Sequence, residues 1–90
     1  MLAGMIGLGN MGTAVGNLIA SNGHELIGWE FDPQVVDEIN QTHTNARYLP
    51  GISLDPKLKA THSLPEVIEA CPVIFIALPW RALAHCGFHA

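Results

Sequence analysis

Hydrophobic residues along the chain form two kinds of pattern that alternate. Short runs of consecutive hydrophobic residues lie at residues 2–6, 26–29, 58–61 and 73–78, and they predict four short strands. Between these runs, hydrophobic residues recur every three or four positions over about 10–21, 33–41 and 64–70, which predicts three helices. Strands and helices that alternate in this way are typical of a parallel sheet with right-handed crossovers. The chain is therefore predicted to have an α/β fold.

Residues at the ends of the first and third predicted helices support these boundaries. The first helix places Val15, Leu18 and Ile19 on one face, and Asn22-Gly23 is a favourable left-handed stop after it. The segment Ser63-Leu-Pro-Glu66 has the spacing of a capping box, with a proline near the start of the third helix.

The second predicted helix is followed by a long irregular segment. Asp32 is a good N-cap and Pro33 suits the first helical position, so this helix is expected to run from Pro33 to about Gln41. Its hydrophobic face consists of Val35, Val36 and Ile39. Residues 42–56 contain two prolines and a glycine and predict a loop. A loop of this length in a compact domain is usually either functional or disordered.

Composition narrows the class of protein. The chain has 90 residues, of which 49% are hydrophobic and 13% charged, which suits one small globular domain and is too hydrophobic for a disordered one. The net charge is −4 and the chain has four Lys and Arg residues in all, so we expect no basic surface for nucleic acid. The hydrophobic runs are too short to span a membrane, no charged segment precedes the first, and two cysteines do not make a disulfide framework. We therefore expect a soluble, cytoplasmic protein.

The segment Gly7-Leu-Gly-Asn-Met-Gly12 follows the first predicted strand and opens the first helix. Its glycines have the G-x-G-x-x-G spacing of a dinucleotide-binding turn. Gly7 allows a sharp turn, Gly9 lets a pyrophosphate approach the backbone, and Gly12 allows the helix to pack closely on the sheet. The main-chain amides of Asn10, Met11 and Gly12 are then expected to be unpaired donors at the positive end of the helix, which favours a diphosphate.

Acidic residues follow the second predicted strand at the distance expected for such a domain. Glu30 and Asp32 lie eighteen and twenty residues beyond Gly12. Glu30 is a candidate to accept hydrogen bonds from the adenosine ribose, and the alternative is a solvated carboxylate at the strand end. Asp32 fits the role of helix cap better than that of ribose ligand, because Pro33 follows it.

The order of the elements predicts the arrangement of the sheet. A dinucleotide-binding turn after the first strand implies the strand order 3-2-1-4, with helices on both faces. Residues 73–78 are hydrophobic on both faces, as expected of a central strand, yet the sequence ends about a dozen residues later. The predicted fold is an incomplete Rossmann-type sheet of about four strands, with the outer edge of the fourth strand uncovered.

Further segments resemble one enzyme family. Ile39-Asn40, Asn45-Ala-Arg-Tyr-Leu-Pro-Gly-Ile-Ser-Leu54 and Leu58-Lys-Ala-Thr61 resemble the region after the second helix in NAD(P)-dependent glycerol-3-phosphate dehydrogenase. Asn22-Gly-His-Glu25, Trp29, Asp32-Pro33 and Ala77-Leu-Pro79 match the pattern of the same family. The resemblance extends over residues 2–79, and its most specific part is the Arg-Tyr-Leu-Pro-Gly run.

This resemblance implies a function and a set of residues that contact the cofactor. The family reduces dihydroxyacetone phosphate with NADH or NADPH to glycerol 3-phosphate, which feeds phospholipid synthesis. The resemblance implies that Asn10 and Met11 lie against the pyrophosphate, Phe31 by the adenosine and Tyr48 in a loop near the cofactor. Pro79 is expected close to the nicotinamide. Together with Gly7, Gly9, Gly12 and Glu30, these residues form the predicted cofactor site.

Three positions depart from the pattern of the family. Met11 replaces a large aromatic residue, although a contact through its amide is kept. Phe31 stands where many members have Arg or His, a cation that can meet the 2′-phosphate of NADP, so NAD is favoured over NADP. In Pro79-Trp-Arg81 a small polar residue is expected, and the resemblance ends from Trp80 onward.

The resemblance also places the chemistry outside this sequence. The catalytic lysines and the helical substrate domain of the family lie downstream of residue 90, and Lys57 and Lys59 flank the third strand away from the ligand edge. Residues 1–90 are therefore expected to form the N-terminal part of a dinucleotide-binding domain without a catalytic residue. Alone, the chain is expected to bind the cofactor and to catalyse nothing.

Two other functions stay open at this point. The Gly7–Gly12 segment also resembles the opening of 3-hydroxyacid dehydrogenases and of pyrroline-5-carboxylate reductase, which lack the Arg-Tyr-Leu-Pro-Gly loop. A binding or assembly module could instead pair the uncovered edge of the fourth strand with another chain, for example in a homodimer. His85, Cys86 and His89 are close in sequence but have no fourth ligand in view, so no metal site is predicted.

Overall fold

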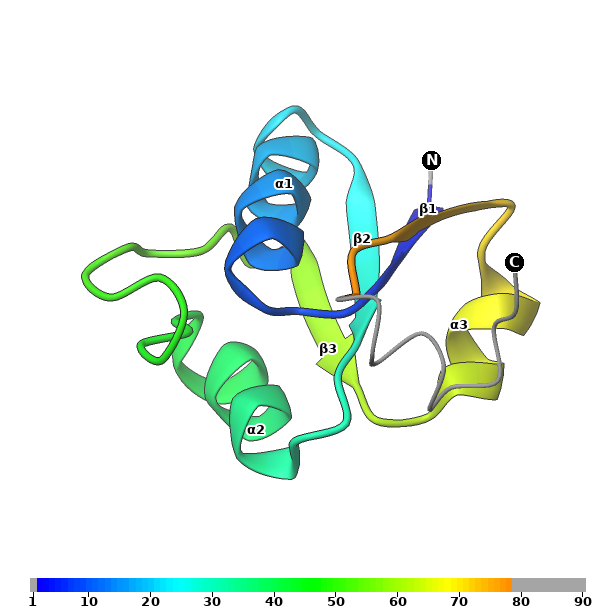
Figure 1. The fold of residues 1–90 in the computed structure, drawn as a ribbon. Helices are drawn as coiled ribbons and strands as arrows, with labels where there is room; N and C mark the ends of the chain where they lie inside the picture. The colour runs from blue at the N-terminus through cyan, green and yellow to red at the C-terminus, as the bar shows by residue number, and fades with distance from the viewer. Residues whose placement is uncertain (1, 79–90) are drawn as a thin grey trace.

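The computed structural model describes residues 2–78, in which strands and helices alternate (Figure 1). The strands are β1 (Leu2–Ile6), β2 (Glu25–Trp29), β3 (Leu58–Thr61) and β4 (Val73–Ile76). The helices are α1 (Asn10–Ser21), α2 (Pro33–Thr42) and α3 (Leu64–Ala70). Each element lies within two residues of its predicted bounds. The predicted α/β alternation is therefore confirmed.

The four strands form one parallel sheet in the order β3-β2-β1-β4. This order, which the glycine-rich turn predicts, is confirmed. In the register of the sheet, Ile6 at the end of β1 lies between Trp29 of β2 and Ile76 of β4. The carboxyl ends of the strands therefore meet at one edge, where open parallel sheets bind their ligands.

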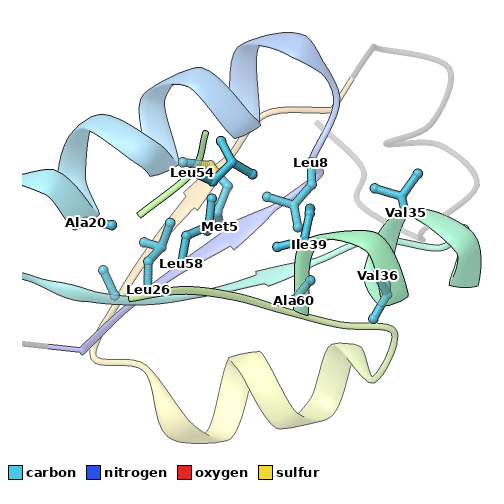
Figure 2. Close-up of a cluster of buried hydrophobic side chains, with 11 residues drawn as sticks. Met5, Leu8, Ala20, Leu26, Val35, Val36, Ile39, Leu54, Leu58 and Ala60 are labelled. Carbon is cyan, nitrogen blue, oxygen red and sulfur yellow. The ribbon is translucent and has the colours of Figure 1, made fainter. Parts of the chain in front are cut away.

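Helices cover both faces of the sheet. Figure 2 shows α1 and α2 on one face and α3 on the other. The main hydrophobic core lies between the sheet and the α1–α2 layer and consists of Ala3, Met5, Leu8, Ala20, Leu26, Val35, Val36, Ile39, Leu54, Leu58 and Ala60. On the opposite face α3 packs close to β1, since a Cβ on Gly4 would lie 2.7 Å from Val67 Cγ1. Cys71 is buried there, as expected, and burial raises the pKa of its thiol.

The face through which α1 packs on the sheet differs from the predicted one. Its buried residues are small or polar and consist of Gly12, Thr13, Gly16 and Ala20. Leu18 is 63% exposed and Val15 is 40% exposed, so the expected hydrophobic face is wrong at these two residues, whereas Ile19 is partly buried against the core as expected. The physical reason is distance, because a Cβ on Gly16 would lie 2.7 Å from Leu26 Cδ2. The helix axis lies too close to the sheet for large side chains to fit between them.

Of the caps predicted for the other two helices, the one on α2 forms and the one on α3 does not. Asp32 caps α2 as predicted, because its Oδ1 accepts a hydrogen bond from the Gln34 amide at 2.9 Å, and the predicted hydrophobic face is buried. The capping box predicted for α3 does not form. The Ser63 side chain makes no capping bond, and Glu66 Oε2 instead accepts a hydrogen bond from the Thr61 hydroxyl at 2.9 Å. This bond ties the start of α3 to the end of β3.

The two edges of the sheet are covered differently. Along β3, the Asn40 side chain pairs with Ala60 as a neighbouring strand would, donating to its carbonyl oxygen and accepting from its amide at 2.8 Å each. Within residues 2–78, β4 pairs with β1 alone, and Val73, Phe75 and Ile76 are exposed. The hydrophobic fourth strand is thus an edge strand in this part of the chain.

None of the helices within residues 2–78 has the length and the hydrophobicity that crossing a membrane requires. Pro79, Trp80 and Arg81 lie outside the described residues, and so do His85, Cys86 and His89.

Candidate dinucleotide-binding site

Two glycines of the β1–α1 turn are required by the fold itself. Gly7 has a φ of +101°, a conformation that side chains disfavour, and a Cβ there would also lie 2.7 Å from the Ala77 carbonyl oxygen. A Cβ on Gly12 would collide with the Gly7 carbonyl oxygen. Both residues therefore have the structural roles predicted for them, in the sharp turn and in the close approach of α1.

Gly9 differs from the other two glycines because nothing in the described protein requires it to lack a side chain. Its backbone has φ −75° and ψ −160°, an extended conformation open to any residue. A Cβ on Gly9 would find no neighbour closer than Tyr48 Cε1 at 4.0 Å. The backbone of the turn is therefore accessible from this side, at the start of α1.

The amides at the start of α1 are partly paired. The first main-chain hydrogen bond of the helix runs from the Thr13 amide to the Gly9 carbonyl oxygen at 3.0 Å. The Met11 amide donates to Asn10 Oδ1 at 2.9 Å, so the prediction of an unpaired amide is wrong at Met11. Both side chains are exposed. A bond between adjacent residues on the surface is one that an incoming anion can replace.

Glu30 is buried against the turn. The residue follows β2 directly and is 4% exposed, and its two carboxylate oxygens accept hydrogen bonds from the amides of Leu8 and Asp32 at 3.2 and 3.1 Å. The alternative of a solvated carboxylate is therefore wrong. The negative charge is held by main-chain donors, which joins the β1–α1 turn to the start of α2.

Asn45 anchors the loop after α2 to the same turn. Its side chain is fully buried and its Nδ2 donates to the Leu8 carbonyl oxygen at 3.0 Å and to Thr13 Oγ1 at 2.9 Å. Thr13 Oγ1 in turn donates to the Leu8 carbonyl oxygen at 3.0 Å. Sequence reasoning assigned no role to Asn45, although it opens the segment that carries the family resemblance.

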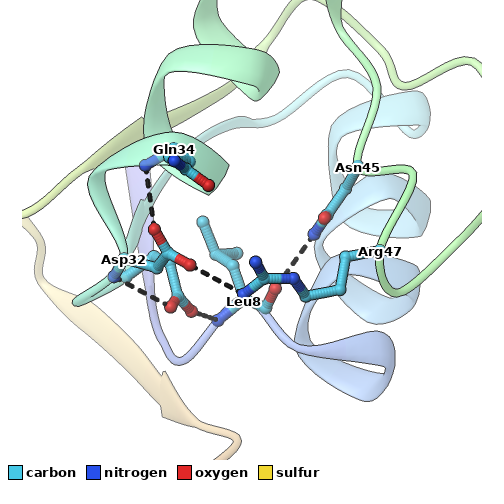
Figure 3. Close-up of polar contacts among 6 residues, drawn as sticks. Leu8, Asp32, Gln34, Asn45 and Arg47 are labelled. Atoms are coloured by element: carbon cyan, nitrogen blue, oxygen red, sulfur yellow. Dashed lines mark hydrogen bonds and ion pairs between the residues drawn. The ribbon is translucent and has the colours of Figure 1, made fainter.

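Arg47, from the loop after α2, places a cation at the end of β2. Arg47 forms an ion pair with Asp32, with 2.7 Å between Nη1 and Oδ2, and Figure 3 shows its side chain reaching from the Asn45 loop to the start of α2. The Gln34 amide, followed by the Arg47 guanidinium, lowers the pKa of Asp32. The Tyr48 hydroxyl and then the Asp32 carboxylate raise the pKa of Arg47. The sequence gives no local signal for this cation, because Arg47 lies fifteen residues from Asp32.

The remaining predicted residues lie around this edge. Phe31 is exposed just past β2, and its ring centroid is 6.4 Å from that of Trp29. Tyr48 lies beside Gly9 and packs partly against the core. Pro79, the residue predicted near the nicotinamide, is beyond the described part of the chain. The arrangement offers an open glycine backbone, helix-terminal amides, an exposed aromatic ring and one cation within a small area.

Comparison with known proteins identifies the family. The family described as NAD-dependent glycerol-3-phosphate dehydrogenase N-terminus matches residues 3–87. The chain belongs to this family. The match favours glycerol-3-phosphate dehydrogenase over the 3-hydroxyacid dehydrogenase and pyrroline-5-carboxylate reductase alternatives. Membership implies a nicotinamide dinucleotide as the class of cofactor.

Individual glycerol-3-phosphate dehydrogenases agree with this assignment. The chain is 43% identical over 79 residues to the NAD(P)+ enzyme of Staphylococcus carnosus, which covers 88% of this chain and 24% of that protein. It is 44% identical over 75 residues to the enzyme of Acinetobacter baylyi, covering 83% of this chain and 21% of that protein. The chain thus spans about a quarter of the length of these relatives.

Solved structures of the family have the same fold. The glycerol-3-phosphate dehydrogenase of Coxiella burnetii matches with a TM-score of 0.79 at 31% identity, covering 87% of this chain and 24% of that one. The Saccharomyces cerevisiae enzyme matches with a TM-score of 0.84 at 26% identity, covering 94% of this chain and 28% of that one. The Rossmann-type assignment is therefore confirmed by structures as well as by strand order.

Proposed function

We propose that this chain is the part of a glycerol-3-phosphate dehydrogenase that binds the dinucleotide, and that the β1–α1 turn holds the pyrophosphate. The observation that carries the proposal is the open space at Gly9. Neither the backbone conformation of Gly9 nor its packing excludes a side chain, so a ligand is the simplest reason for its absence. The positive end of α1 favours an anion at the same place.

The residues of the site have distinct proposed roles. The amides of Asn10 and Gly12 donate to the pyrophosphate, and the Met11 amide exchanges Asn10 Oδ1 for a phosphate oxygen. Phe31 and Tyr48 lie along the adenosine side. Glu30 positions the turn, and its carboxylate also lies where ribose hydroxyls are expected. Pro79 keeps its proposed place near the nicotinamide by resemblance alone.

NAD is the preferred cofactor in this proposal. The carboxylates of Glu30 and Asp32 both lie at the end of β2, where the additional phosphate of NADP would have to bind. Arg47 lies there too, but its charge is paired with Asp32. We therefore keep NAD as the proposed cofactor, on the basis of a paired cation and not of the missing cation that Phe31 suggests.

The reaction of the whole enzyme needs residues beyond this site. We propose that the complete protein reduces dihydroxyacetone phosphate to glycerol 3-phosphate, with the dinucleotide supplying the hydride. The described residues bind and orient the cofactor, and no reacting group is assigned among residues 2–78. We therefore expect the 90-residue chain to bind NAD⁺ or NADH without oxidising NADH when dihydroxyacetone phosphate is added. Appreciable oxidation would contradict this division of roles.

The direct test is a calorimetric titration of the chain with NAD⁺. We expect binding by the unaltered chain and its loss in Gly9→Val, because the valine side chain fills the space beside the turn. Ala70→Val is the matched control, since Ala70 is exposed on α3 at the other face of the sheet. Undiminished affinity in Gly9→Val would contradict the pyrophosphate site. Absence of binding in a folded, unaltered chain would contradict the proposed function.

A second candidate function is assembly through the edge of β4. Exposed hydrophobic residues on that strand favour it, because an edge strand with such residues can pair with another chain. Analytical ultracentrifugation tests it. A dimer that forms without NAD would support a homodimer through this edge, and a monomer at micromolar concentration would count against it.

A further inference from the structure

We infer that Asp32 and Arg47 form a charge pair that sets the preference between NAD and NADP, with Arg47 as the ligand of the 2′-phosphate when Asp32 does not hold it. This inference rests on the proposed function. It names a pair as the determinant of cofactor choice, one residue at the end of β2 and one from the loop after α2.

Arg47 lies where the ribose 2′ position of a dinucleotide is expected. In a dinucleotide-binding domain the ribose 2′ position lies beside the end of the second strand. Glu30 and Asp32 occupy that place here, and the Asp32 amide donates to Glu30 Oε2 at 3.1 Å. Arg47 Nη1 is 2.7 Å from Asp32 Oδ2, so the guanidinium lies at the same end of the strand. Asn45, two residues earlier, is fixed to the turn and fixes the base of the loop that carries Arg47.

The guanidinium of Arg47 has the chemistry to bind a phosphate. Arginine has five N–H donors, and their planar arrangement matches a phosphate. Asp32 engages Nη1 of Arg47 and the Tyr48 hydroxyl also acts on the guanidinium, while the Arg47 side chain is 54% exposed and so can be reached by a phosphate. A 2′-phosphate carries up to two negative charges and would compete with the single charge of Asp32. Asp32 opposes it in two ways, by repelling the phosphate and by holding Arg47.

The two carboxylate oxygens of Asp32 have different partners. Oδ1 accepts from the Gln34 amide and caps α2, and Oδ2 accepts from Arg47. Asparagine caps helices about as well as aspartate. Asp32→Asn therefore keeps the cap while removing the charge that holds Arg47, so a change in cofactor preference can be separated from a change in the helix.

The experiment measures the dissociation constants of NAD⁺ and NADP⁺ for the unaltered chain and for Asp32→Asn, Arg47→Gln and the double variant. We expect the preference for NAD to fall by about tenfold in Asp32→Asn, the effect of about one charge-assisted hydrogen bond. In Arg47→Gln we expect NADP binding to weaken while NAD binding is nearly unchanged. Asp32→Asn is expected to raise NADP affinity less in the Arg47→Gln background than in the unaltered chain, because without Arg47 only the repulsion by Asp32 is left to remove. An equal gain in both backgrounds would contradict the role of Arg47.

Matched variants control for net charge. Asp37→Asn and Lys57→Gln make the same changes of charge at exposed positions outside the site, and neither is expected to alter the ratio of the two dissociation constants. Circular dichroism shows whether each variant keeps its helices. If Asp32→Asn loses helix content, the ratio in Arg47→Gln still decides the question, because Arg47 does not cap α2.

The outcomes separate the two proposals. If both dinucleotides bind and the ratio of their dissociation constants is the same in all variants, the charge-pair inference is wrong and the proposed function stands. Equal weakening of NAD and NADP in Arg47→Gln would also contradict the inference, because it would place Arg47 on the adenine or the pyrophosphate. If the folded, unaltered chain binds neither dinucleotide, the proposed function is wrong and the inference is wrong with it.

Discussion

The side-chain amide of Asn45 donates a hydrogen bond to the Leu8 carbonyl oxygen, 37 residues earlier in the chain, at 3.0 Å. Leu8 lies inside the glycine-rich turn, and its amide donates to Glu30. One residue of the turn is therefore held from two sides, by the end of β2 and by the loop after α2. The shape of the turn depends on residues that a local motif does not contain.

Replacing Asn45 by alanine is expected to weaken both the fold and cofactor binding. The change removes two buried hydrogen bonds, each of which contributes about 0.5–1.5 kcal/mol, while the Leu8 carbonyl oxygen keeps the bond from Thr13 Oγ1. Urea unfolding followed by circular dichroism measures the loss of stability, and calorimetry measures NAD affinity. Gln41→Ala, at an exposed position on α2, is the control. An unchanged unfolding midpoint in Asn45→Ala would show that these bonds contribute nothing.

Asn40→Ala is expected to lower stability without a direct effect on the site. Asn40 makes two hydrogen bonds to Ala60 at the outer edge of β3, and their loss is expected to cost about 1–2 kcal/mol. Under conditions in which the variant is folded, NAD affinity is expected to equal that of the unaltered chain. Reduced affinity in the folded variant would show that the β3 edge communicates with the turn.

The glycines of the turn are expected to respond differently to alanine. Gly9→Ala is expected to change the free energy of unfolding by less than about 1 kcal/mol, because a reduced unfolded-state entropy offsets a poorer N-cap. Gly12→Ala is expected to prevent native folding, because the new methyl group would collide with the Gly7 carbonyl oxygen. Thermal unfolding of the two variants tests the difference, and a stable Gly12→Ala protein would contradict it.

The Asp32 ion pair and helix cap are expected to make stability depend on pH. The pKa of Asp32 is lowered from its ordinary 3.8, so its contribution is fully present above 3.8 and is lost as pH falls through the lower folded-state pKa. The stability difference between the unaltered chain and Asp32→Asn should therefore shrink as pH is lowered from 7 to well below 3.8. Urea unfolding at several pH values measures it. The lowered pKa of Asp55 is common to both proteins and cancels in the comparison. A difference independent of pH would contradict the assignment.

Local signals in the sequence were sufficient to predict the elements and their order. Asp32 and Pro33 mark the start of α2 through interactions within three residues, and the hydrophobic runs mark the strands. The glycine spacing then fixes β1 in the middle of the sheet. These features depend on neighbours along the chain, which is why pattern and propensity were enough for them.

The features that were not predicted depend on residues far apart in sequence. Glu30 is buried because amides from two separate turns surround it, and Arg47 reaches Asp32 because Asn45 fixes the loop. Hydrophobicity alone predicts the wrong packing position for Val15 and Leu18 of α1, because it takes no account of residue size. Gly16 decides how close the helix lies, and the larger residues are turned outward as a result. Residue size at the contact was the signal that could have found this face.

The outward position of Val15 and Leu18 has a practical consequence for handling this protein. Exposed hydrophobic side chains on a helix favour aggregation at high protein concentration, and these two are not part of the hydrophobic core. Exchanging Leu18 for glutamate or lysine should therefore raise solubility while the architecture beneath is left as it is. The exposed residues of α1 can therefore be substituted without altering the glycine-rich turn at its start.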